Sequence, residues 1–106
     1  MKNAPNGMEP PKGFEVEPGP SWHRWAKHRS DSELGTISLR LDELKIRFGK
    51  PHQHAGLGAR HLKDNVFEFR ISRDIRVVFL HLKPRTLRLM MVGNHNEVRT
   101  WIRENA

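Results

Sequence analysis

The sequence predicts an α+β domain, with helices in its N-terminal half and a three-stranded antiparallel sheet in its C-terminal half. Apolar residues recur every three or four positions from Leu34 to Phe48, which is the period of one helix face. From Val66 to Met91 the period changes to two, as in a strand with one buried face. The length of 106 residues fits one domain of this kind.

The N-terminal region divides into a leader, a strand and a short helix. Residues 1–13 are rich in Pro, Gly and Asn, so we expect a flexible leader before a single domain over residues 14–106. Residues 14–17 alternate apolar and charged side chains, which predicts a short first strand. Pro18-Gly19-Pro20 interrupts it, and Ser21 can cap a short helix that carries Trp22, Trp25 and Ala26.

A second, longer helix is predicted next. Ser30 or Asp31 can cap it, and Glu33 lies in its first turn, where the helix dipole favours an acidic side chain. Gly49 and Pro51 end the helix. Its apolar stripe is interpreted as core and consists of Leu34, Ile37, Leu41, Leu44 and Phe48.

Residues 50–62 are rich in Gly and His and are predicted to be a connection. Three strands follow, with turns at residues 72–74 and 83–85. Asn94 or Asn96 can cap a final helix that carries Val98, Trp101 and Ile102. We expect one face of the sheet to be almost wholly apolar, formed by Phe67, Phe69, Ile71, Ile75, Val77, Phe79, Leu87, Leu89 and Met91.

Composition excludes several classes of protein. There is no Cys, which removes disulfides, thiolate metal sites and cysteine nucleophiles. The longest apolar run is Val77–Leu80, far short of a membrane span, and no secretory signal is visible, so we expect a cytoplasmic protein. Lys and Arg number 19 against 12 Asp and Glu, and this net charge of +7 suggests an anionic partner such as nucleic acid.

The predicted strand register brings two arginines together. With three-residue loops, Arg70 lies directly across from Arg76, and Arg76 across from Val92. Like charges that face each other on a sheet are destabilising, so something should offset them. Either Glu68 pairs with one of the arginines, or the pair binds a phosphate, whose oxygens match guanidinium groups.

His95 follows Val92 by three residues and is therefore expected within about 10 Å of the two arginines. A histidine can donate or accept a proton near neutral pH. Arginines and a histidine could together cleave RNA without a metal, because RNA supplies its own 2′-hydroxyl nucleophile.

Three segments in this order carry a family resemblance: Gly-Leu-Gly…His-Leu-Lys at 56–63, VFEFRISRDIRVVF at 66–79 and VGNHNEV at 92–98. They resemble the RelE/ParE superfamily of toxins from bacterial type II toxin–antitoxin systems, over roughly residues 14–104. The resemblance implies two N-terminal helices packed on a curved antiparallel sheet. It also implies an endoribonuclease that cleaves mRNA, in many members on the ribosome, and a cognate antitoxin that blocks it.

The resemblance implies roles for individual residues. Arg76 matches the arginine that contacts the scissile phosphate, Arg70 matches a basic position on the preceding strand, and His95 matches a general acid or base. His61 and Lys63 match a segment where some members place catalytic or RNA-contacting side chains. We also expect Arg73 and Arg88 to bind RNA.

The sequence departs from the family pattern in two ways. It has no Tyr, although several family nucleases use a C-terminal tyrosine, and Trp101 is the only aromatic residue nearby. No general base can be assigned, and Glu97 and Asp74 are the candidates.

Two alternatives remain open: a ParE-like toxin that binds DNA gyrase without chemistry, and a module that only binds RNA. His95 favours the nuclease, because ParE-like members generally lack this histidine. We expect no cofactor and no metal site, since His52 and His54 in one loop, with no Cys, would hold zinc poorly.

Overall fold

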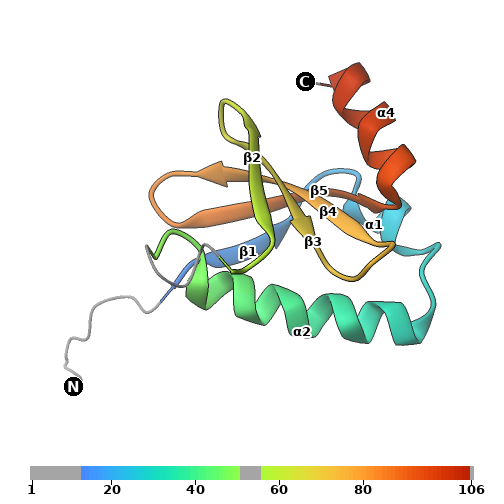
Figure 1. Ribbon diagram of the computed structural model, residues 1–106, viewed down its shortest axis with the longest axis horizontal. Coiled ribbons are helices and arrows are strands. Elements are labelled where there is room, and N and C mark those ends of the chain that lie inside the picture. The colour runs from blue at the N-terminus through green and yellow to red at the C-terminus, as the bar shows by residue number, and fades with distance from the viewer. Residues whose placement is uncertain (1–12, 51–55, 106) are drawn as a thin grey trace.

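The computed structural model describes residues 13–50 and 56–105 (Figure 1). The expected leader, apart from Gly13, and the loop histidines His52 and His54 lie outside these residues. The described elements, in chain order, are β1 (Glu15–Pro18), α1 (Trp22–Ala26), α2 (Asp31–Arg47), β2 (Ala59–Lys63), β3 (Val66–Arg70), β4 (Arg76–Leu82), β5 (Thr86–Gly93) and α4 (His95–Asn105).

The strands form one mixed sheet in the order β1-β5-β4-β3-β2. The α+β class, the N-terminal strand and the three-stranded meander of β3, β4 and β5 are confirmed. The sheet differs from the prediction in two respects. The first strand β1 pairs parallel to β5, and residues 59–63, predicted as part of a connection, form an additional antiparallel edge strand beside β3.

Helix α2 is capped at its N-terminus by two reciprocal hydrogen bonds and is followed by a glycine at its C-terminus. The Ser30 hydroxyl accepts a hydrogen bond from the backbone N–H of Glu33, and the Glu33 carboxylate accepts one from the backbone N–H of Ser30. This reciprocal pair satisfies two N–H groups that the helix itself cannot satisfy. Gly49 follows the helix with φ of 82°, a left-handed conformation that glycine adopts without strain.

The two faces of the sheet are covered differently (Figure 1). Helix α2 lies across one face and places Ile37 and Leu44 against Phe69, Val77 and Phe79. On the opposite face, α4 packs Val98 on a smaller cluster of Val66, Val78 and Met91. Helix α4 lies over one end of this second face only (Figure 1).

The register of the first hairpin is as predicted, with Phe67 opposite Phe79, Phe69 opposite Val77 and Arg70 opposite Arg76. In the second hairpin Phe79 faces Leu89 as predicted, but an irregularity between Val78 and Phe79 shifts the pairs of Val78, Val77 and Arg76.

The shift corrects two expected positions. Val77 faces Val92 instead of Met91, and Arg76 faces Gly93 instead of Val92. The extra residue on β5 moves Met91 from the α2 face to the α4 face, because successive strand residues point to opposite faces. No helix among the described residues is long and apolar enough to span a membrane.

Candidate active site

Arg70 and Arg76, the two arginines predicted to face each other, lie at one end of the sheet, which we call the rim. The rim comprises Arg70 at the end of β3, Arg76 at the start of β4, Gly93 at the end of β5, and the turn that joins β3 to β4. Arg70, Arg76 and Gly93 are neighbours across the sheet, and adjacent strands lie about 4.8 Å apart. His95 is the first residue of α4, two residues beyond Gly93, and its side chain is exposed.

A buried carboxylate offsets the charge of the rim. Glu68 is 3% exposed, and its two oxygens bind different arginines. Oε2 accepts a hydrogen bond from Arg76 Nη1 at 3.0 Å, and Oε1 accepts one from Arg60 Nη2 at 2.7 Å. Because one negative charge faces two positive charges, the cluster keeps a net charge of +1 before Arg70 is counted.

The structure therefore shows Glu68 paired with Arg76, one of the two arrangements considered for the facing arginines. It also shows a second partner of Glu68, Arg60 on β2. Arg76 is held in place by this bond, with 22% of its side chain exposed, whereas Arg60 is largely exposed. Arg76 Nε is buried and has no hydrogen-bond partner within the described part of the chain. A guanidinium that is fixed through Nη1 and still partly exposed suits an incoming anion, because it does not have to be ordered when the anion binds.

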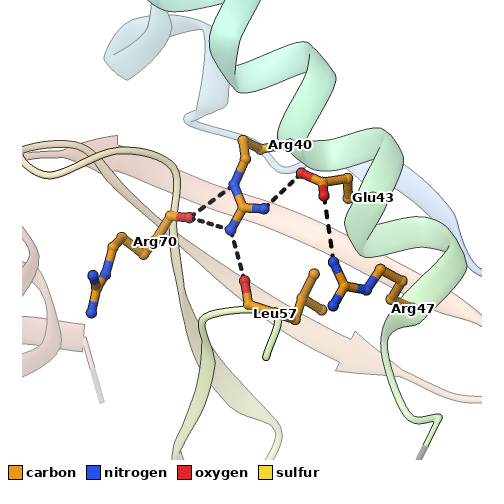
Figure 2. A network of polar contacts seen from close by, with 5 residues as sticks. All are labelled: Arg40, Glu43, Arg47, Leu57 and Arg70. Carbon is orange, nitrogen blue, oxygen red and sulfur yellow. Dashed lines mark hydrogen bonds and ion pairs between the residues drawn. The ribbon is translucent and has the colours of Figure 1, made fainter. Parts of the chain in front are cut away.

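Helix α2 fixes the backbone of the rim from the other face of the sheet (Figure 2). Arg40 Nη2 donates hydrogen bonds to the carbonyl oxygens of Leu57 at 2.7 Å and Arg70 at 2.9 Å. Arg40 Nη1 donates to Glu43 Oε1, and the guanidinium lies 4.7 Å from the centroid of the Phe69 ring. The side chain of Arg70 points away from this network, so Arg40 holds the main chain of Arg70 without binding its charge.

The acidic candidates for a general base have different surroundings. Glu97 Oε1 accepts a hydrogen bond from the Asn94 backbone N–H at 2.7 Å, and Asn94 Oδ1 accepts one from the Glu97 N–H at 2.8 Å. Of the two caps considered for α4, Asn94 is therefore the one used, and Glu97 serves the start of the helix. Asp74 is exposed in the turn of the rim.

Four other residues are predicted to bind RNA; one of them lies at the rim and three lie away from it. Arg73 lies exposed in the turn of the rim. His61 pairs with Phe67 and Lys63 with Val66, at the opposite end of β3 and about 10–13 Å along the strand from Arg70 at 3.3 Å per residue. The His61 ring lies 5.0 Å from the Phe67 ring. Arg88 lies across from Leu80 and binds Glu17 at 2.7 Å, about 13 Å along β4 from Arg76.

Sequence reasoning missed two residues of the site, Arg60 and Arg40. Arg60 was hidden because its strand was predicted as a connection. Arg40 and Glu43 are spaced to meet on one helix face, but the bonds of Arg40 to the carbonyls of Leu57 and Arg70 depend on the tertiary fold. Among the described residues, no group of three His, Asp or Glu side chains is placed to hold a metal ion.

No protein-family profile matches the sequence, and no curated protein is similar to it in sequence. Its structure, in contrast, is similar to solved structures. A chain of the archaeal RelE–RelB complex from Pyrococcus horikoshii superposes with a TM-score of 0.60 and 11% identity, over 77% of this chain and 94% of that chain. The chain has a RelE-like fold.

Further solved structures have the same RelE-like fold. A chain of the RelB–RelE antitoxin–toxin complex from Methanococcus jannaschii gives a TM-score of 0.59 at 12% identity, over 81% of this chain and 98% of that chain. YafQ from E. coli gives 0.54 at 15% identity, over 80% of this chain and 97% of that chain. The similarity extends over nearly the whole length of these structures.

Proposed function

We propose that this protein is the toxin of a type II toxin–antitoxin pair and that it cleaves mRNA, in association with the ribosome, to stop translation. The observation that carries the proposal is the placement of Arg70, Arg76 and His95 at one rim of a RelE-like sheet. A guanidinium fixed by Glu68, a second guanidinium that is exposed, and an exposed imidazole are groups that can support phosphodiester cleavage through the 2′-hydroxyl.

The chemistry proceeds in one displacement. The 2′-oxygen attacks phosphorus and loses its proton, the bond from phosphorus to the 5′-oxygen breaks, and that oxygen takes up a proton. The products are a 2′,3′-cyclic phosphate and a 5′-hydroxyl. Arg76 and Arg70 stabilise the negative charge that builds on the phosphoryl oxygens, and His95 exchanges a proton with one of the two reacting oxygens. Asp74 or a water molecule completes the proton transfer.

The remaining basic residues bind RNA away from the reacting phosphate. Arg73 contacts a phosphate at the rim itself. His61, Lys63 and Arg88 lie too far from Arg76 to act in the same step, so their contribution is to affinity and not to the chemical rate.

An antitoxin segment is the proposed protein partner. The structural relatives include complexes with the antitoxins RelB and DinJ. On this chain the α4 face of the sheet has partly buried apolar side chains that α4 covers incompletely, namely Leu62, Leu80 and Met90. A partner segment laid across this face would bury them and block the rim at the same time.

The test is an mRNA cleavage assay with purified protein, with and without ribosomes. We expect His95→Ala and Arg76→Ala each to lower the cleavage rate by at least about a hundredfold, the range for loss of a proton-transfer group or a charge-stabilising group. Lys45→Ala is the control, because Lys45 is a cation on α2, which covers the other face of the sheet, and it pairs with Asp42. Normal cleavage by the His95→Ala variant would contradict the assigned proton transfer.

A parallel assay of DNA gyrase supercoiling tests the alternative toxin activity. We expect no inhibition by the wild-type protein. Inhibition of gyrase without any RNA cleavage would replace the nuclease proposal with the ParE-like one. RNA binding with neither activity would leave only the RNA-binding module.

A further inference from the structure

Two hollows lie between α1 and α4, beside the rim. The first has a volume of about 270 Å³ and is lined by Trp25, Asn96, Glu97, Thr100, Trp101 and Glu104. The second has a similar volume of about 270 Å³ and adds Arg24, Ser21 and Met90. Trp25, Trp101 and Glu104 line both, so the two hollows are adjacent parts of one surface.

This surface begins next to the candidate active site. Asn96 directly follows His95 in the first turn of α4, and the side chain of Glu97 lies against Gly93 of the rim. Trp25 contacts both hydrophobic clusters, which places it at the junction of α1, the sheet and α4. A nucleotide bound to the hollows would therefore be a neighbour of the phosphate that Arg76 and His95 contact.

The lining of the first hollow favours a nucleobase over a phosphate. Two half-buried indole rings provide flat aromatic surface, on which bases of any identity stack. The Asn96 amide and the Thr100 hydroxyl can each donate and accept hydrogen bonds. The carboxylates of Glu97 and Glu104 repel a phosphate, whereas they can accept hydrogen bonds from the amino and imino groups of a base.

The second hollow shares Glu104 with the first but adds a guanidinium, which can balance this carboxylate and bind the phosphate of the same nucleotide. Arg24 supplies the guanidinium of the second hollow. Arg24 Nη2 donates a hydrogen bond to Ser21 Oγ at 3.2 Å, which restrains the Arg24 side chain. Arg24 lies in a run of basic residues without any acidic one, formed by His23, Arg24, Lys27, His28 and Arg29. An aromatic slot next to a restrained cation is the arrangement by which proteins bind single-stranded RNA.

We infer that the α1–α4 junction binds one nucleotide of single-stranded RNA next to the cleaved bond, with its base against Trp101 and Trp25 and its phosphate near Arg24. The inference rests on the proposed function, because it names a second part of the same RNA-binding surface. It adds a base-binding site to a rim that contacts only the RNA backbone.

Binding of an uncleavable RNA tests the inference separately from cleavage. The probe is a fluorescently labelled 2′-O-methyl hexanucleotide, and six versions of it each lack one base. On the wild-type protein we expect removal of the base at one position to weaken binding about tenfold, the effect of losing one stacked base. In Trp101→Leu the complete and the abasic probes should bind within about twofold of each other.

Two further variants show whether the effect of Trp101→Leu comes from the loss of base binding or from a change in folding. Thr100→Gln changes an exposed residue and fills the first hollow, so it should also abolish the difference between the probes. Trp22→Leu is the matched control, because Trp22 lies on the same short helix but faces α2 and lines neither hollow; it should keep the tenfold difference.

The outcomes separate the two proposals. The inference is overturned if no abasic position weakens binding, if the tenfold difference survives in Thr100→Gln, or if the hexanucleotide does not bind at all. Base-dependent binding by a protein that cleaves no mRNA would refute the nuclease proposal and leave the base-binding site standing.

Discussion

Replacing Glu68 by Gln should destabilise the protein through the loss of one buried charge. The change keeps the shape of the side chain but removes the carboxylate that binds Arg76 at 3.0 Å and Arg60 at 2.7 Å. Arg76 is 22% exposed and would be left beside a neutral group, whereas Arg60 is 68% exposed and can return to water. The ion pairs of Glu68 with Arg76 and with Arg60 should therefore contribute unequally to the free energy of unfolding.

The magnitude follows from these exposures. Breaking a buried ion pair by removing one partner costs about 3–5 kcal/mol, and an exposed pair contributes about 1 kcal/mol or less. Because Arg76 is partly exposed, we expect Glu68→Gln to lower the free energy of unfolding by about 3 kcal/mol. For a domain of this size that corresponds to a fall in Tm of about 15 °C.

Double-mutant cycles show which of the two ion pairs accounts for the loss of stability in Glu68→Gln. Urea denaturation of Glu68→Gln, Arg76→Gln, Arg60→Gln and the two double variants gives both coupling energies. We expect about 2 kcal/mol between Glu68 and Arg76, and less than about 1 kcal/mol between Glu68 and Arg60. Equal couplings, or a larger one for Arg60, would refute the argument that burial decides the strength of these pairs.

Three further changes test the supports of the rim and of α2. Arg40→Ala should cost about 2–4 kcal/mol in urea denaturation, because two backbone carbonyls lose a charged donor, and Arg40→Lys should recover less than half of this since an ammonium lacks the fork. Gly93→Ala should lower stability by about 1–3 kcal/mol, because its Cβ would lie 2.7 Å from Glu97 Oε1. Gly35→Ala, where the added Cβ meets nothing within 4 Å, should raise stability by about 1 kcal/mol. A change of the same sign in both variants would contradict the close approach of Glu97 to Gly93. Ser30→Ala should cost about 1 kcal/mol through loss of the helix cap, and an unchanged Tm would show that the cap is dispensable.

Local patterns were sufficient to predict the helices and the first hairpin. The stripe from Leu34 to Phe48 and the caps Ser30 and Asn94 act over a few residues, so they can be read along the chain. The same holds for Arg70 and Arg76, which a short turn brings opposite each other. For this reason the juxtaposition of two arginines could be predicted from spacing alone.

Features that depend on distant residues could not be predicted in this way. The edge strand Ala59–Lys63 follows Gly58, contains no β-branched residue and is stabilised as a strand by pairing with β3. The irregularity in the β4–β5 pairing depends on how the two strands fit together, and nothing in the Met90-Met91 segment marks it. Because β2 was not foreseen, its Arg60 could not be assigned to Glu68.

The pairing of β1 with β5 also constrains when the protein can fold during synthesis. Glu15 has its partner at Thr86, so the first strand made must wait for one of the last. Contacts between such distant parts of a chain form slowly and leave strand edges exposed meanwhile. His95 emerges later still, after all five strands. A nascent chain that has not yet reached residue 95 lacks the imidazole of the rim, so the proposed chemistry requires the chain to extend beyond β5 into α4.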